Sequence, residues 1–136
     1  MGRIIGLDYG IKKTGISVTD PLQIIVNPLT VISTDELLAY LIKYAEGEEI
    51  EKIVIGEPKH KDGNPVYFEK DIQLFILKLQ KHFPEIEIDR QDEDYTSAEA
   101  KELIKKLNLK KKKRQDKTLV DKLSSVLILQ RYLKHI

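Results

Sequence analysis

The 136-residue sequence predicts an α/β fold in which a five-stranded mixed sheet is flanked by helices, in the order βββαβαβαα. The apolar period changes from two to 3.6 near residue 33, short links join the first three apolar runs, and strand–helix units then alternate. A chain of this length, with 41% hydrophobic residues, is able to bury one hydrophobic core. We therefore expect a single domain over residues 1–136.

The first three elements are expected to be strands of an antiparallel meander. Residues 3–8 (RIIGLD) and 14–19 (TGISVT) are rich in β-branched residues, and the short link between them favours a hairpin. A third strand is expected over 23–31, where Pro28 is typical of an edge strand because proline donates no backbone hydrogen bond. Short connections of this kind place consecutive strands side by side in antiparallel pairs.

Helices and strands alternate in the rest of the chain. Ser33 or Thr34 is expected to cap a helix that ends at Gly47, because apolar residues recur there at helical spacing. Residues 52–55 (KIVI) form a short apolar run that is typical of a strand buried on both faces. The remaining expected elements are a loop at 56–65, a helix at about 66–82, a strand at 86–89, a helix beginning at Thr96 or Ser97, and a final helix at roughly 118–134.

Composition excludes several classes of site. The chain has no cysteine and only three histidines, which excludes disulfides, thiol nucleophiles and cysteine-ligated metals, so that any metal must be held by oxygen. No apolar run approaches the ~20 residues that a membrane helix needs. The sequence also shows no signal-peptide pattern, and we expect a cytoplasmic protein with no membrane partner.

The net charge of +1 conceals a strong asymmetry. Residues 105–117 contain eight basic residues and one acidic residue, a net charge of +7, which leaves −6 on the rest of the chain. This segment lacks aromatic residues, so it is expected to contact the backbone of a nucleic acid and not to read its sequence. The alternative is a solvated loop. The residues expected to bind nucleic acid are Lys12, Lys13, Lys110, Lys111, Lys112, Lys113 and Arg114.

Two aspartates stand at positions suited to chemistry. Asp8 ends the first strand, on the same face as Gly6, whose missing side chain is expected to leave that face open. Open α/β sheets place their ligands at such carboxyl ends, although an Asp before Tyr9-Gly10 could also simply cap a turn. Asp121 lies near the start of the largely apolar last helix, where a carboxylate is costly unless it is paired or metal-bound. The alternative for Asp121 is an exposed position in the first turn.

A third acidic feature is the run Asp92-Glu93-Asp94, just after the last expected strand. Adjacent carboxylates repel one another, so that a cation or a basic partner would stabilise them. The alternative is a solvated acidic loop that leads to a helix cap at Thr96.

Four stretches of the sequence together resemble a known family. They are GLDYGIKKTGISVTDPL, VIGEPKHKDG, DEDYTSAEA and VDKLSSVLILQRYL, and they span nearly the whole chain in order. The family is YqgF/RuvX, the Holliday-junction-resolvase-like proteins that are also called pre-16S rRNA nucleases, within the ribonuclease H-like superfamily. The resemblance implies a ribonuclease H-like fold and an endonuclease that depends on Mg²⁺ or Mn²⁺. Its substrate would be nucleic acid, either pre-16S rRNA processed at its 5′ end or a branched DNA junction.

The resemblance also implies roles for individual residues. Asp8, Glu93 and Asp121 match the family's catalytic and metal-binding positions, and Asp92 is a possible further one. Asp94 departs from the family, because the Asp-Glu-Arg motif has an arginine there, and this puts substrate affinity in doubt.

A second departure is Glu57, which stands in Gly56-Glu57-Pro58 where the family reads Gly-Leu-Pro. If the strand before it lies parallel to the first strand, Glu57 could supply an additional ligand near Asp8. The alternative is a glutamate in a loop that faces solvent.

These carboxylates suit a two-metal hydrolysis, in which oxygen ligands hold two ions and no protein nucleophile is needed. Two other functions are considered. The first is a non-catalytic module that binds nucleic acid or the ribosome. The second is a phosphotransferase, because DYGIKKTGISV also resembles the phosphate hairpin of sugar kinases, but those enzymes need two such domains. The oligomeric state is expected to be a monomer or a homodimer.

Overall fold

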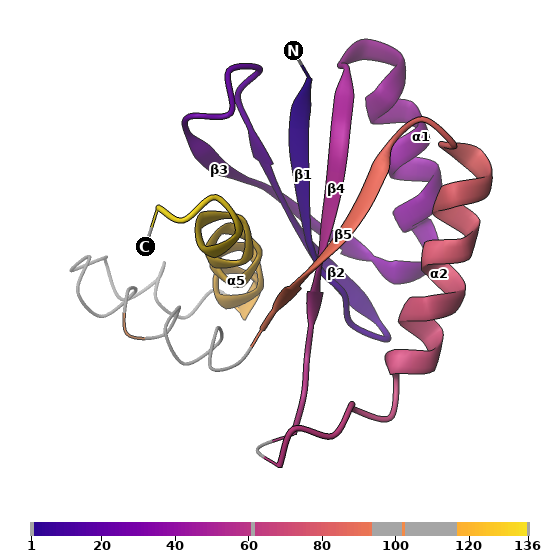
Figure 1. The fold of residues 1–136 in the computed structure, drawn as a ribbon, viewed down its shortest axis with the longest axis vertical. Coiled ribbons are helices and arrows are strands. Elements are labelled where there is room, and N and C mark those ends of the chain that lie inside the picture. The colour runs from indigo at the N-terminus through magenta and orange to yellow at the C-terminus, as the bar shows by residue number, and fades with distance from the viewer. Residues whose placement is uncertain (1, 61, 94–101, 103–116, 136) are drawn as a thin grey trace.

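The computed structural model describes residues 2–60, 62–93, 102 and 117–135. A twisted sheet forms the middle layer, with helices on both faces (Figure 1). The strands are β1 (Arg3–Asp8), β2 (Lys13–Thr19), β3 (Val26–Ser33), β4 (Ile50–Glu57) and β5 (Glu87–Asp92). The helices are the 3₁₀ helix η1 (Thr34–Glu36) and the α-helices α1 (Leu37–Gly47), α2 (Glu69–His82) and α5 (Lys117–Tyr132).

The sheet has the order β3-β2-β1-β4-β5 and is mixed, as the sequence predicts. β1 pairs with β2, and β2 with β3, in antiparallel register, which confirms the meander. β4 lies parallel to both β1 and β5. Pro28 lies in β3 at one edge of the sheet, where its missing N–H costs no hydrogen bond to a further strand.

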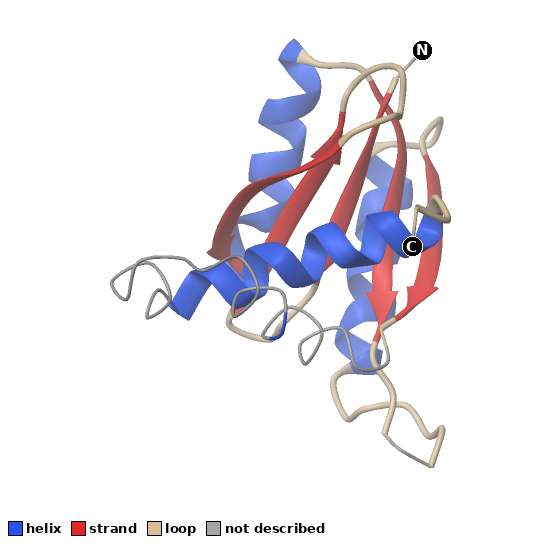
Figure 2. Cartoon of the chain, turned by 90° about the vertical axis from the view of Figure 1, so that its left-hand side faces the viewer, coloured by secondary structure: helices blue, strands red, loops and turns tan. Residues whose placement is uncertain are grey.

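Each face of the sheet buries its own core, because side chains alternate along the strands. Ile5 and Leu7 of β1, with Ile53 and Ile55 of β4, pack beneath α1 and α2. Ile4 and Val54 point to the other face, where they meet Ile128 and Leu129 of α5. Helix α5 crosses that face and contacts all five strands, as Figure 2 shows.

Small residues let α5 lie very close to the sheet. A side chain at Gly6 would meet Leu129, since a Cβ there would lie 2.5 Å from the leucine Cγ. The face at Gly6 is therefore filled by α5 and is not open as expected. Ser124 and Ser125 are fully buried, and Ser17 Oγ donates a 2.7 Å hydrogen bond to the carbonyl of Ser125. At Gly15, a Cβ would collide with the carbonyl oxygen of Asp121.

Replacing Gly15 with Ala is therefore expected to destabilise the protein by about 2 kcal/mol, because the clash is with rigid helix backbone and α5 must shift. Urea unfolding measures this loss. Gly47→Ala is the matched control, because a Cβ at this position has nothing within 4 Å. If both variants were equally stable, α5 would not pack against β2 as described.

Some element bounds differ from the expectation. β3 begins at Val26 and not at residue 23, because Gln23 has a left-handed φ of 60° and Asp20 Oδ1 accepts hydrogen bonds from the N–H groups of Ile24 and Ile25. β4 and β5 are longer than expected, and α2 starts at Glu69. Of the helix expected after Thr96, the structure describes only Glu102, which is helical and exposed.

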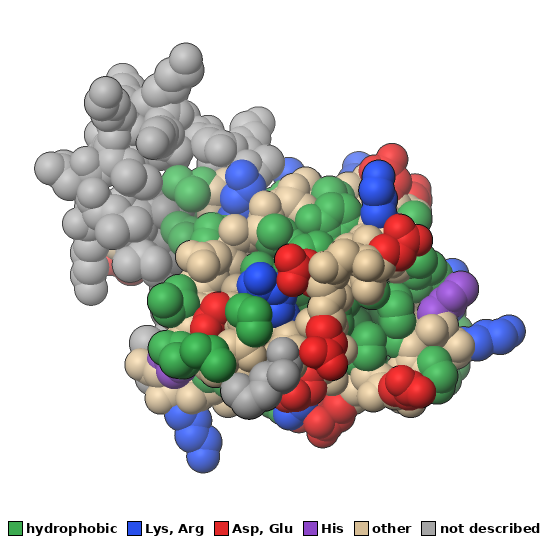
Figure 3. Space-filling view, turned by 90° about the horizontal axis from the view of Figure 1, so that it is seen from above, with side chains coloured by type: hydrophobic (Ala, Val, Ile, Leu, Met, Phe, Trp, Pro, Cys, Tyr) green, Lys and Arg blue, Asp and Glu red, His purple; other side chains and the backbone are tan. Residues whose placement is uncertain are grey.

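Figure 3 views from above the end of the molecule that holds the amino ends of β1 and β4, where acidic, basic and apolar side chains are interspersed. A hollow of about 580 Å³ there is lined by four glutamates and by apolar residues such as Phe83 and Ile86. The glutamates are Glu48, Glu49, Glu51 and Glu85. The candidate chemistry lies at the other end of the sheet.

Candidate active site

Asp8, Glu93 and Asp121 come from three different elements. Asp8 is the last residue of β1, on the face that α5 covers, and Glu93 follows directly after β5. The backbone N–H of Glu93 donates a 3.2 Å hydrogen bond to the carbonyl of Glu57, which ties this residue to the end of β4. Its carboxylate lies over Gly56, where a Cβ would be only 2.6 Å from Glu93 Oε2. The missing side chain of Gly56 thus makes room for Glu93, a role that the sequence did not indicate.

Asp8 and Glu93 form a carboxyl pair in which each residue is only partly exposed and Glu93 Oε2 is buried. The protonated Glu93 carboxyl donates a hydrogen bond to Asp8, and burial followed by this contact raises the pKa of Glu93 to about 10. Burial also raises the pKa of Asp8, and the negative charge of Asp121 raises it further. The pair therefore holds a proton at neutral pH. The third carboxylate lies beside it, because Asp121 packs against Gly15, the residue paired with Asp8 in the sheet.

Asp121 is partly exposed, with 35% of its side chain accessible to solvent. It lies beyond the first turn of α5, where its backbone packs against Gly15. Lys13 Nζ lies 3.8 Å from Asp121 Oδ2 and is half-exposed at the start of β2. Lys12 is exposed in the preceding turn. Two cationic side chains thus stand at the same edge as the carboxylates.

Glu57 and Asp92 project from the opposite face of the sheet. Glu57 lies on the same face of β4 as Ile55, which belongs to the core beneath α1 and α2. The carboxylate of Glu57 pairs with Lys59 Nζ at 3.4 Å. Asp92 is exposed and lies on the same face of β5 as Arg90, whose side chain donates hydrogen bonds to Glu69 of α2. β4 is parallel to β1 as supposed, but the side chain of Glu57 is directed to the opposite face from Asp8. This arrangement contradicts the interpretation of Glu57 as a further ligand.

Arg90 braces the strand end that carries Glu93. Its guanidinium donates two 2.9 Å hydrogen bonds to the carboxylate of Glu69, the first residue of α2. It also donates to the carbonyls of Gly56 at 3.0 Å and Ile55 at 3.3 Å. The hydrogen bond from Arg90 is the main reason that the pKa of Glu69 is lowered. A lone arginine in a strand gave no sequence signal for this role, because all of its partners are distant in the chain.

Replacing Arg90 with Met is expected to cost about 2 kcal/mol of unfolding free energy, because Glu69 and two carbonyl oxygens lose their donor while only 18% of either side chain is exposed. Chemical denaturation measures this cost. The double variant Arg90→Met/Glu69→Gln should recover part of it, because it leaves no unpaired charge. A double variant no more stable than the single one would show that the ion pair is not what stabilises this corner.

No group of three or more His, Cys, Asp or Glu side chains within the described residues is close enough to hold an ion, so the metal site stays a prediction. Lys110 to Arg114 and Asp94 fall outside the described residues. Within the part of the chain that the structure describes, no helix is both long and apolar enough to cross a membrane.

Proteins of known sequence and structure resemble this chain over its whole length. It is 45% identical to a protein from Christiangramia forsetii and 44% identical to one from Bacteroides thetaiotaomicron, both called "Putative pre-16S rRNA nuclease". Both matches cover 98% of this chain, and 98% and 97% of the respective relative.

Solved structures show the same fold at low sequence identity. RuvC from T. thermophilus, in complex with a Holliday junction substrate, superimposes with a TM-score of 0.58 at 15% identity and covers 98% of this chain and 96% of its own. The Fowlpox virus resolvase, in complex with Holliday junction DNA, also gives 0.58, at 12% identity and with 98% and 97% coverage. The sheet and its helices are therefore the ribonuclease H-like fold of RuvC, as the resemblance implied. The family model of RuvX, described as Holliday junction resolvase, matches residues 2–135, and the chain belongs to this family.

Proposed function

We propose that the chain is a metal-dependent endonuclease that hydrolyses phosphodiester bonds in structured nucleic acid, with pre-16S rRNA as its first candidate substrate. The observation that carries this proposal is the Asp8–Glu93 carboxyl pair beside Asp121 at the carboxyl edge of the sheet. The names of the relatives at 44–45% identity point to the same activity and substrate. Cytoplasmic location, a single domain over residues 1–136 and a monomeric or dimeric state remain predictions.

The donor set fits Mg²⁺ or Mn²⁺. Its groups are all carboxylate oxygens, which hard divalent cations prefer. Asp8 and Glu93 share a proton, and a bound cation would replace that proton. Asp8, Glu93 and Asp121 would hold the metal. When bound, such ions activate water and stabilise the negative charge that develops on a phosphate.

The residues of the chain itself supply three further contributions. Glu93 must release its proton before its carboxylate becomes a ligand, so metal binding is expected to release protons. Lys13, which now faces Asp121, is placed to meet a phosphate oxygen of the substrate instead. Arg90 holds the ends of β4 and β5 together and so fixes the position from which Glu93 projects.

The direct test offers the purified full chain three labelled substrates: an RNA that spans the 5′ end of 16S rRNA, a four-way DNA junction and a linear duplex. Each is incubated with Mg²⁺, with Mn²⁺ and with EDTA. Cleavage that requires metal and prefers one structured substrate supports the proposal and identifies that substrate. Binding without cleavage under every condition would favour the non-catalytic nucleic-acid-binding module instead.

Replacing Lys110 to Lys113 and Arg114 with Gln is expected to weaken duplex binding and flatten its salt dependence. Each lost phosphate contact removes about 0.9 from the slope of log K against log salt concentration. Fluorescence anisotropy between 50 and about 200 mM salt measures this slope. Gln at the exposed Lys43, Lys70 and Lys81 provides the control. An unchanged slope in the first variant would reject the role of the basic segment.

A further inference from the structure

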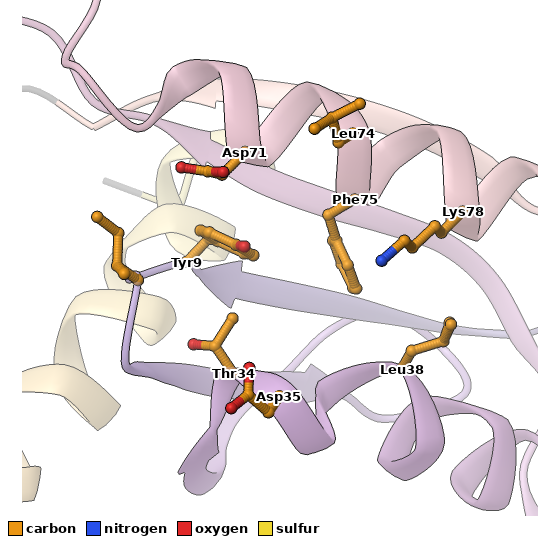
Figure 4. A pocket seen from close by; sticks show the side chains of 9 residues that line it. Tyr9, Thr34, Asp35, Leu38, Asp71, Leu74, Phe75 and Lys78 are labelled. Atoms are coloured by element: carbon orange, nitrogen blue, oxygen red, sulfur yellow. The ribbon is translucent and has the colours of Figure 1, made fainter.

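A second concave feature lies at the carboxyl edge of the sheet, on the face opposite the carboxylates. It is a cleft of about 430 Å³ between α2 and the segment formed by η1 and α1, with Tyr9 between them (Figure 4). This volume lies within the range of small-molecule sites, which is about 300–1,000 Å³. The candidate nuclease mechanism leaves the cleft unused.

Two aromatic rings line the cleft. Tyr9 and Phe75 have ring centroids 5.6 Å apart and planes inclined at 41°. Phe75 comes from α2 and is anchored in the core, whereas Tyr9 is only partly buried. Leu38 of α1 adds an apolar wall across from them, as Figure 4 shows. A surface of this kind suits a flat ligand that stacks on it.

Carboxylates stand on both sides of these rings. Asp35 of η1 and Asp71 of α2 reach the cleft from opposite walls, and Figure 4 shows them on either side of Tyr9. These ionised carboxylates only accept hydrogen bonds, whereas Lys78 adds a cation beyond Phe75, so the part of the cleft beside Tyr9 suits a flat group that carries donors on its edge. Nucleobases with amino groups have this chemistry, and guanine offers two adjacent donors.

The path from the carboxylates to the cleft is short. Asp8 and Tyr9 are adjacent in the chain but face opposite sides of the sheet, and the turn that follows them carries Lys12 and Lys13. A strand whose phosphate lies at Asp8 would pass these lysines as it crosses the edge of the sheet. A base attached to the next nucleotides would then reach Tyr9.

We propose that this cleft is a subsite for one unpaired nucleobase of the substrate strand, stacked on Tyr9 and Phe75 with its amino edge on Asp35 or Asp71. The inference rests on the proposed function, because it requires a nucleic acid strand at Asp8. Enzymes that act on nucleic acids commonly read an unstacked base by such stacking and edge contacts. The subsite would make cleavage depend on the base near the scissile phosphate.

The test uses the sign of a charge effect. If an aspartate merely repels nucleic acid, the variant that neutralises it should bind the probe more tightly. If the aspartate accepts a hydrogen bond from a base, the same variant should bind the probe more weakly. Asp35→Asn and Asp71→Asn are compared with Glu36→Gln, a neighbouring exposed acid that does not line the cleft. The probes are short oligouridylates that carry one guanine, one hypoxanthine or one abasic site. Binding is measured in EDTA, so that it is independent of cleavage.

We expect the guanine probe to bind the unmodified protein about tenfold more tightly than the abasic probe, with hypoxanthine between them, since a good base contact discriminates by about this factor. Asp35→Asn or Asp71→Asn should remove most of this preference, while Glu36→Gln should keep it. Equal binding of all three probes, or no binding of any, would overturn the subsite. The subsite would also be overturned if Asp35→Asn and Asp71→Asn both kept the preference for guanine, as Glu36→Gln is expected to do.

Two further outcomes separate this inference from its alternatives. If arginine amide shifted the NMR signals of Tyr9 and Phe75 and guanosine monophosphate did not, the cleft would be a site for a basic peptide and the proposal would be wrong. If the chain cleaved RNA or DNA but showed no dependence on the base, the subsite would fail and the proposed nuclease would stand. Base-dependent binding by a chain that cleaves nothing would count against the nuclease alone.

Discussion

Replacing Asp8 with Asn is expected to reduce metal-dependent cleavage by about 1,000-fold or more, a barrier increase of about 4 kcal/mol. Asp8 is the residue that links the group, because Glu93 donates a hydrogen bond to it and the charge of Asp121 acts on it. An amide has the same shape but lacks the negative charge that a divalent cation requires. Single-turnover cleavage with saturating enzyme measures the loss without interference from product release.

Nucleic-acid binding by the same variant should be retained or strengthened, because one negative charge is removed from a site that receives a polyanion. Glu57→Gln is the matched control. Its carboxylate pairs with Lys59 on the other face, so cleavage should stay within about threefold of the original rate, a change of less than 1 kcal/mol. Cleavage that survived in Asp8→Asn, or that was lost only in Glu57→Gln, would place the chemistry elsewhere.

The parts of the fold that sequence predicted well depend on local periodicity. The alternation in residues 3–8 put Asp8 on the face of Gly6, and the structure brings that face against α5, where Asp121 lies. Pro28 indicated the edge strand because its missing N–H is a property of the residue itself. Features of this kind need no knowledge of which elements meet.

The misplacement of Glu57 had a local cause. The sequence suggested that the strand ended at residue 55 and that Glu57 lay in a loop, where its direction would be free. In the structure β4 continues to Glu57, which pairs with Asp92 of β5, so the alternation of the strand fixes its side chain on the α2 face. Strand ends are the least predictable part of an element, and two further residue pairs at the end of β4 decided the face of Glu57.

Other features could not be predicted because they join distant parts of the chain. Gly15 and Gly56 matter only because Asp121 and Glu93 pack against them. Arg90 has partners on β4 and α2, and the cleft needs Asp35 and Asp71 from two helices. None of these partners shows a sequence spacing that would identify it, because tertiary packing alone brings them together.

Replacing Glu93 with Gln is expected to stabilise the protein at alkaline pH while abolishing cleavage. The raised pKa of Glu93, about 10 in the folded state, means that the folded chain keeps a proton that the unfolded chain releases above its ordinary pKa of about 4.3. The unfolded state therefore binds fewer protons, and the stability of the unmodified protein falls as pH rises between these two values. Asp8 acts in the same direction, since its pKa is also raised.

Glutamine keeps the hydrogen-bond donor toward Asp8 but has no proton to lose, so the variant should escape this penalty. We expect its advantage in urea unfolding to be small at pH 4.5 and to grow up to pH 8 by about 1.4 kcal/mol for each pH unit. Glu57→Gln should show no such pH-dependent gain. Added Mn²⁺ should then raise the unfolding free energy of the original protein and not that of Glu93→Gln, because only a carboxylate gains from the cation. A gain in unfolding free energy that did not depend on pH would mean that glutamine merely packs better than glutamate. The expected pattern would show that the Glu93 carboxyl destabilises the fold at high pH and is also the group that the metal needs.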